Sequence, residues 1–200
     1  MTTRNEDLGT SPAPGTLRIE RLLPGPVERV WAYLTEGAKR GRWLASGELE
    51  PRAGGRLELR FHHADLSHEK TPPERFRSME GGVTSQETVT HWEPPRRLRY
   101  TWGNQGAAAS EVEFELEPRG DEVLLVLTHR RLRSREDMQG TAAGWHTHLG
   151  VLADVLAGRE PRGFWSSHAG VEPEYAERLA GAVPYAGAEP TIASEQGAPA

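Results

Sequence analysis

The sequence contains no cysteine and no long apolar run. The lack of cysteine among the 200 residues excludes disulfides, thiolate zinc sites and a cysteine nucleophile. No stretch approaches the roughly 20 apolar residues that span a bilayer, and the N-terminus lacks the apolar segment of a secretory signal. With a net charge of −5, the chain has no general attraction for nucleic acids or anionic lipids. We therefore expect a cytoplasmic protein with neither nucleic-acid nor membrane partners.

Both ends of the chain are small, polar and rich in proline. Residues 1–15 and 182–200 cannot bury enough apolar surface to offset the entropy lost on ordering, so we expect two disordered tails. Between the tails, the sequence predicts one domain over residues 16–160. A helical extension over residues 161–181 is expected to pack on that domain.

The extension carries large apolar side chains. Pro173 suits the first position of a helix, because a proline there loses no hydrogen bond, and it predicts a helix that runs to about Leu179. Phe164 and Trp165 are large for an exposed linker. We expect them to fold back on the domain or to contact a second copy of the chain in a homodimer.

The middle of the chain alternates apolar and polar residues with a period of two, which indicates half-buried strands. Short turns join these strands, so they predict an antiparallel meander. A first strand at about residues 17–22 and two short helices, near 27–34 and 36–43, precede it. The apolar positions that share one strand face are Leu57, Leu59 and Phe61; Leu98, Tyr100 and Trp102; Val112, Phe114 and Leu116; and Val123, Leu125 and Leu127.

Residues 144–158 are the one long stretch with a helical period. Gly158 follows the last apolar residue and suits the left-handed conformation at a helix end. We predict an α+β fold in which a curved sheet of about six to seven strands wraps around this C-terminal helix. The residues on its apolar face are Trp145, Leu149, Leu152 and Leu156.

Residues 64–82 interrupt the strand pattern with a proline pair at their centre. A long irregular insertion within a compact domain is often a lid or a functional loop. The alternative interpretation is a solvated extension of the hairpin. The sequence leaves both interpretations open.

Five short motifs in order resemble the START-like (SRPBCC) superfamily. The resemblance is closer to its branch related to the activators of the heat-shock chaperone ATPase (AHSA-like domains). The motifs are Pro26-x-x-x-Val30-Trp31-x-x-Leu34-Thr35 with Arg42-Trp43; His91 to Trp102; Val112 to Leu116 with the Pro-Arg-Gly-Asp turn; Leu127-Thr128-His129; and Gly144-Trp145-His146.

The resemblance covers about residues 16–158 and implies the helix-grip fold. Members hold a hydrophobic or amphipathic ligand between the sheet and the long helix, and a minority act as enzymes or chaperone partners. The family has no universal catalytic motif, so the resemblance implies no catalytic residue. The insertion at 64–82 and the segment after residue 160 depart from the minimal fold.

Apolar and aromatic residues of the sheet and the long helix form the candidate ligand-binding set. Ligand pockets are mostly apolar with a few polar groups, whereas the alternative for these residues is a filled core. His148, or else His129, could supply a hydrogen bond to a ligand. The predicted ligand-binding residues are Trp43, Phe61, Tyr100, Trp102, Phe114, Trp145, His148, Leu149 and Leu152.

No catalytic residue, metal site or cofactor is predicted. The histidines lack the convergent carboxylates that would complete a metal-ligand set, and the sequence has no nucleophile elbow or phosphate-binding glycine loop. Glu111, Glu113 and Glu115 alternate with apolar residues and predict a solvated strand face. The basic run over residues 130–135 predicts a solvated loop or a docking patch for an acidic partner.

Three functions remain as hypotheses. The first is a module that binds a small hydrophobic ligand. The second is a stress-response interaction domain that modulates a heat-shock chaperone ATPase. The third is an enzyme that acts on a hydrophobic substrate, which would need a titratable group in the cavity.

Overall fold

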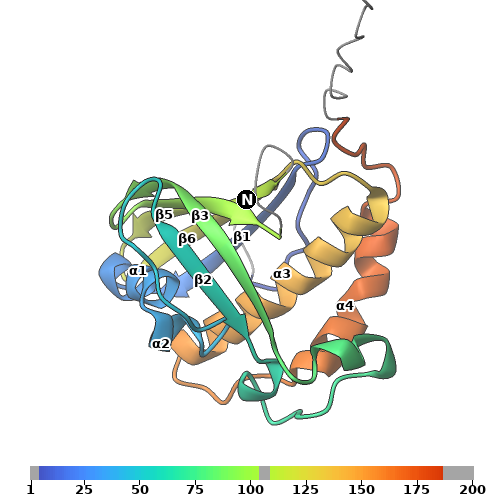
Figure 1. Ribbon diagram of the computed structural model, residues 1–200, viewed down its shortest axis with the longest axis horizontal. Helices are drawn as coiled ribbons and strands as arrows, with labels where there is room; N and C mark the ends of the chain where they lie inside the picture. The colour runs from blue at the N-terminus through green and yellow to red at the C-terminus, as the bar shows by residue number, and fades with distance from the viewer. Residues whose placement is uncertain (1–4, 104–108, 187–200) are drawn as a thin grey trace, which may run out of the picture.

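The computed structural model describes residues 5–103 and 109–186 of the chain. Strands form the middle of the chain and the two longest helices follow them (Figure 1). The elements in order are β1 (Leu17–Pro24), α1 (Val27–Thr35), α2 (Gly37–Arg40), β2 (Arg56–Phe61), η1 (His63–Asp65), η2 (Glu74–Met79), β3 (Val83–Glu93), β4 (Arg97–Trp102), β5 (Ser110–Arg119), β6 (Glu122–Arg130), α3 (Arg135–Leu156) and α4 (Phe164–Arg178).

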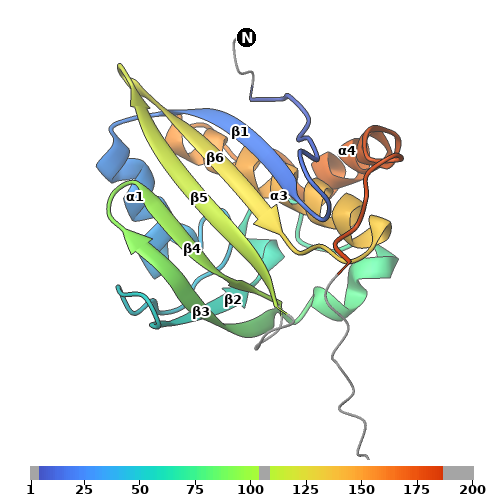
Figure 2. The same cartoon turned by 90° about the horizontal axis from the view of Figure 1, so that it is seen from above.

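The six strands form one antiparallel sheet in the order β1-β6-β5-β4-β3-β2. Strands β2 to β6 follow one another as a meander, and β1 pairs with β6, so that Ile19 lies opposite Leu127. The sheet curves, α3 crosses one of its faces, and α4 lies beside α3 (Figure 2). The predicted α+β fold, a curved antiparallel sheet around a long helix, is confirmed.

Helix α3 begins nine residues earlier than the sequence analysis predicts. The hydroxyl oxygen of Ser134 accepts a hydrogen bond from the Asp137 backbone N–H over 2.9 Å, and Asp137 Oδ2 accepts one from the Arg133 N–H over 3.1 Å. These two bonds satisfy free N–H groups at the start of the helix. At the other end Gly158 has φ +69°, as its predicted role at the helix end requires.

Helix α4 also begins earlier than predicted. Pro173 lies inside the helix instead of at its start. The helix begins at Phe164 because its buried residues, which include Phe164, His168, Val171 and Tyr175, recur on one face and pack against α3. Phe164 and Trp165 are buried within the chain itself.

Residues 5–15, predicted as part of a disordered tail, lie against the domain. The side chain of Asn5 exchanges two hydrogen bonds of 2.7 Å with the backbone of Leu22. The backbone N–H of Gly9 donates to the Tyr175 hydroxyl over 2.8 Å. Residues 182–186 of the other predicted tail also lie against the domain, because the Tyr185 N–H donates to the Leu132 carbonyl over 2.8 Å and the Val183 carbonyl accepts from the Gly15 N–H over 2.7 Å. Residues 1–4 and 187–200 lie outside the described residues.

The outer face of the sheet carries paired charges instead of a solvated glutamate row. Glu113 is 6% exposed, and its carboxylate accepts a hydrogen bond from Arg130 over 3.0 Å. Arg131 forms an ion pair with Glu111 over 3.3 Å. The prediction of a solvated face is therefore wrong for Glu113, because Arg130 of β6 and Arg99 of β4 pair with its carboxylate. Within the described residues, no helix has both the length and the apolar character needed to cross a bilayer.

Candidate functional site

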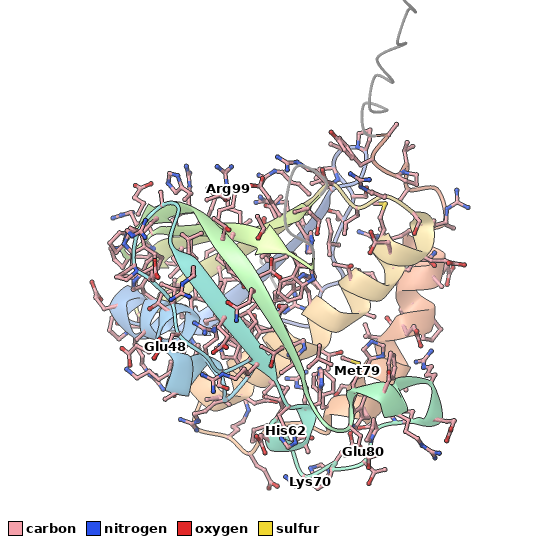
Figure 3. All side chains as sticks on the ribbon, viewed as in Figure 1. Glu48, His62, Lys70, Met79, Glu80 and Arg99 are labelled. Atoms are coloured by element: carbon pink, nitrogen blue, oxygen red, sulfur yellow. The ribbon has the colours of Figure 1, made fainter. Side chains whose placement is uncertain are left out.

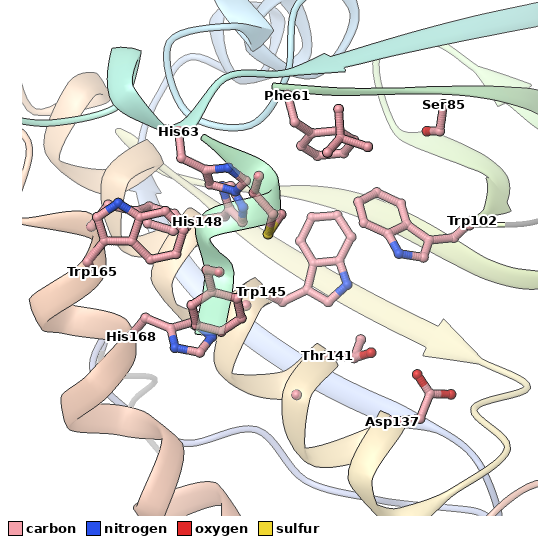
Figure 4. Close-up of a pocket in the computed structure, with 17 residues that line it drawn as sticks. Phe61, His63, Ser85, Trp102, Asp137, Thr141, Trp145, His148, Trp165 and His168 are labelled. Atoms are coloured by element: carbon pink, nitrogen blue, oxygen red, sulfur yellow. The ribbon is translucent and has the colours of Figure 1, made fainter. Parts of the chain in front are cut away.

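A cleft of about 550 Å³ opens between the N-terminal half of α3, the edge of the sheet, the insertion and α4. Figure 4 shows aromatic rings from the sheet, α3 and α4 around it. The lining residues are Phe61, His63, Phe76, Met79, Val83, Ser85, Trp102, Gly103, Asp137, Gly140, Thr141, Gly144, Trp145, His148, Phe164, Trp165 and His168.

The predicted ligand-binding residues divide between this cleft and the core. Four of them line the cleft: Phe61, Trp102, Trp145 and His148. The other five are at most 1% exposed and pack within the hydrophobic core: Trp43, Tyr100, Phe114, Leu149 and Leu152. Helix α3 thus borders open space along its first half and fills the concave side of the sheet along its second half.

Two glycines on α3 leave room for the cleft. A Cβ atom placed on Gly140 or Gly144 would meet no atom within 4 Å. Glycine in a helix interior costs about 1 kcal/mol relative to alanine. The helix therefore carries two unfavourable residues at the positions where side chains would occupy the cleft.

The insertion forms one wall of the cleft by packing against α4. Arg75 binds the carboxylate of Glu172 through both terminal nitrogens. The ring of Phe76 stacks on Trp165 with centroids 5.3 Å apart, and Glu69 accepts a hydrogen bond from the Ser166 N–H over 3.0 Å. Figure 3 shows Met79 and Glu80 on the part of the insertion next to α4. The insertion therefore packs on α4 through these side chains, although most of its residues are exposed.

His148 is held at the inner end of the cleft by its Nδ1 atom. Nδ1 lies 2.7 Å from the carbonyl oxygen of Trp43, and because a carbonyl only accepts, Nδ1 carries the proton. Burial lowers the pKa of His148 to about 3, so the ring is neutral near pH 7. A neutral ring protonated at Nδ1 has a bare Nε2, and Nε2 has no partner among the described residues.

Other polar atoms at this end of the cleft also lack partners. Nδ1 of His63, Nδ1 of His168 and Nε1 of Trp165 are buried without a hydrogen bond in the described structure. Burial lowers the pKa of His63 to about 4. Its ring centroid lies 5.6 Å from that of His148 and 5.2 Å from that of Trp165. These groups therefore form one compact polar cluster in an otherwise aromatic wall.

Sequence reasoning missed the members of this cluster that come from the insertion and the extension. The apolar and helical patterns of the sequence single out neither His63 nor His168. The helical spacing of Phe164, His168 and Val171 was the available signal for α4. No local pattern indicated that the insertion would cover α4, because that contact joins residues 97 positions apart.

The second predicted polar candidate, His129, does not line the cleft. It is fully buried and accepts a hydrogen bond at Nδ1 from the indole N–H of Trp145 over 2.9 Å. Its Nε2 atom lies 2.9 Å from the Ser110 hydroxyl. His129 therefore positions a cleft residue instead of facing a ligand.

The cleft has no metal-binding set and little charge. No group of three or more His, Asp or Glu side chains in the described parts of the chain could hold a metal ion. Its lining, as described, includes no lysine or arginine, and Asp137 is its one carboxylate. The site is suited to an apolar molecule with a polar end.

One family model matches most of the chain. Residues 24–157 match the family described as "Activator of Hsp90 ATPase homolog 1-like protein". The solution NMR structure of a Bordetella parapertussis protein is 45% identical, with a TM-score of 0.73 over 90% of this chain and 96% of that one. No protein of curated function is significantly similar in sequence.

Two more distant structures share the fold. The crystal structure of CalU16 from Micromonospora echinospora is 23% identical over 82% of this chain and 88% of that one, with a TM-score of 0.61. DynU16, a protein of the dynemicin biosynthetic locus, is 20% identical over 76% of this chain and 51% of that one, with a TM-score of 0.57.

Proposed function

Because this chain belongs to the activator of Hsp90 ATPase homolog 1-like family, within the START-like superfamily, we propose that it binds a small hydrophobic or amphipathic molecule in the cleft beside α3. The observation that carries the proposal is the presence of an open cleft beside α3. An aromatic-lined cleft of about 550 Å³ lies where two helix glycines keep side chains out. Ligand sites in proteins commonly enclose about 300–1,000 Å³.

The cleft offers a ligand mainly apolar contact. Rings of Trp102 and Trp145 lie 4.7 Å apart by centroids, and Phe61 packs edge-on to Trp102 at 5.8 Å. A two-ring ligand that buries about 250 Å² of apolar surface gains about 6 kcal/mol at about 25 cal/mol per Å². We expect dissociation constants on the order of 10–100 μM for such a probe.

The test is a titration with the uncharged naphthalene dye Prodan, whose emission changes on leaving water. The wild-type chain is expected to bind it, and Gly144→Phe is expected to abolish binding by filling the cleft. Gly170→Phe is the matched control. It places the same side chain on α4, where a Cβ also meets nothing within 4 Å but outside the cleft lining. Equal binding by all three proteins, or by none, would refute the proposal.

Native mass spectrometry of the freshly purified protein gives an independent test. A co-purified small molecule that is lost in Gly144→Phe and kept in Gly170→Phe supports the cleft as its site. A molecule that remains bound to Gly144→Phe would place ligand binding elsewhere on the chain.

The second candidate function is modulation of a heat-shock chaperone ATPase, which the name of the matched family favours. In the basic run over residues 130–135, Arg130 and Arg131 already pair with Glu113 and Glu111, which leaves Arg133 and Arg135 as its exposed arginines. An ATPase assay with the Hsp90-type chaperone of the same organism tests this function. A changed rate on addition of this protein supports it, and an unchanged rate eliminates it.

A further inference from the structure

We propose that the cleft selects uncharged ligands that carry a hydroxyl group, because the hydroxyl donates a hydrogen bond to Nε2 of His148. Carboxylate analogues of the same shape are rejected. This inference rests on the proposed ligand-binding function and names the chemical class that the site takes.

The neutral ring of His148 carries its proton on Nδ1. The Trp43 carbonyl oxygen, 2.7 Å from Nδ1, can only accept, so it holds the ring in the tautomer with the proton on Nδ1. Nε2 is then an acceptor. A ligand group that pairs with it must be a donor, which a hydroxyl or an N–H is and a carboxylate or an ether is not.

The described surroundings of His148 offer no positive charge to a ligand. Among the described lining residues no arginine or lysine is available to pair with a carboxylate, and Asp137 lies on the same side of α3 as the cleft. The neighbouring ring of His63 is also held neutral, because burial lowers its pKa to about 4. A carboxylate entering this wall would lose its hydration without a compensating cation.

The wall of the cleft that holds His148 also contains a buried donor without a partner. The indole Nε1–H of Trp165 has no partner in the described structure, and Trp165 lines the same cleft. Phe164 connects the two groups, with ring centroids 4.8 Å from His148 and 5.0 Å from Trp165. A hydroxyl both donates and accepts, so it is the simplest group that suits a cluster with an open acceptor and an unsatisfied donor.

Three probes with one aromatic body test the inference near neutral pH: 2-naphthol, 2-methoxynaphthalene and 2-naphthoate. The naphthol offers a donor, the methyl ether keeps the oxygen without the donor, and the naphthoate is an anion. We expect the naphthol to bind about 3- to 10-fold more tightly than the ether, as one net hydrogen bond implies. The naphthoate is expected to bind at least about 10-fold more weakly than the naphthol.

His148→Asn identifies the residue responsible. The asparagine amide can still donate to the Trp43 carbonyl but presents no acceptor at the position of Nε2. The ratio of naphthol to ether affinity is expected to fall to about 1 in this variant. If the variant does not fold, the ¹⁵N spectrum of the wild-type imidazole replaces it: the Nε2 resonance should shift with the naphthol and not with the ether.

The outcomes separate this inference from the function on which it rests. Equal affinity of the wild-type chain for the naphthol and the ether, or tighter binding of the naphthoate, would overturn the selectivity and leave ligand binding intact. An affinity ratio that persists in His148→Asn would assign the selectivity to another residue and overturn the role of His148. If Prodan and all three probes fail to bind, the proposed function falls as well.

Discussion

The indole N–H of Trp145 donates a hydrogen bond to Nδ1 of His129 over 2.9 Å. Because Nδ1 accepts, Nε2 carries the proton and donates to the Ser110 hydroxyl over 2.9 Å. That hydroxyl donates in turn to the Trp102 carbonyl over 3.0 Å. This chain ties α3 to three strands and holds the Trp145 ring at the wall of the cleft. It also requires His129 to be neutral.

The protein is expected to lose stability in acid. Burial lowers the pKa of His129 to about 3, whereas an unfolded histidine titrates near 6.5. Above about pH 6.5 neither state binds the proton. Below it the unfolded state binds the proton and the folded state does not until about pH 3, so stability falls as pH falls through this window. For His129 alone, the loss at pH 5 is about 2 kcal/mol. Urea unfolding at pH 7.5 and pH 5 measures it.

Substitution of His129 measures how much of the acid-induced loss of stability this residue causes. His129→Leu is expected to lower stability at pH 7.5, because it leaves the Trp145 N–H unpaired, but to reduce the further loss between pH 7.5 and pH 5. His68→Leu, at an exposed position, is the control and should leave that loss unchanged. An undiminished acid loss in His129→Leu would contradict the assignment.

Substitution by alanine should affect the stability of the fold differently at two glycines of α3. At Gly144 a Cβ meets open space, so Gly144→Ala is expected to stabilise the fold by about 0.5–1 kcal/mol. At Gly150 a Cβ would lie 3.1 Å from Nε and Nη1 of Arg162, which Asp154 holds through a 2.7 Å ion pair. Gly150→Ala should therefore bring no gain or a loss. Thermal unfolding of the two variants measures both changes in stability. An equal gain in stability in both variants would show that Arg162 moves freely.

Removing the ring of Phe76 should loosen the insertion locally. Phe76 packs against Trp165 and His168, with both centroid separations at 5.3 Å. Phe76→Ala is expected to speed amide exchange within the insertion while β5 and β6 keep their protection. Glu80→Ala, at an exposed position of the same segment, serves as the control. Unchanged exchange in Phe76→Ala would mean that other contacts hold the insertion in place.

The Tyr175 hydroxyl should fasten residues 5–15 to the helices. It accepts the Gly9 N–H over 2.8 Å and lies 3.1 Å from Nδ1 of His146. Tyr175→Phe leaves both groups without this partner, which costs about 1–3 kcal/mol for a buried polar group. Chemical denaturation measures the loss, and Tyr185→Phe at a more exposed position provides the comparison. A loss no larger than that of the control would show that the contact is dispensable.

The start of α3 is encoded in the local sequence, although the apolar pattern does not reveal it. The motif Ser134 to Asp137 is a helix-start signature, but the glycines at 140 and 144 weaken the helical pattern between it and Trp145. The start of α4 was mispredicted for a different reason. The prediction that Pro173 starts the helix is wrong, because the apolar spacing from Phe164 to Val171 indicates an earlier start.

The sequence alone determined the alternation of apolar residues that makes the sheet, the long helix that covers it, and the left-handed turn at Gly158. Each follows from local periodicity or backbone conformation, which neighbouring residues set. Only the tertiary structure decided which aromatic residues border open space. Tyr100 and Trp102 share one face of β4, yet Tyr100 is buried in the core and Trp102 lines the cleft. The difference arises because the end of β4 faces the glycine-bearing half of α3, a contact that no spacing along the chain encodes.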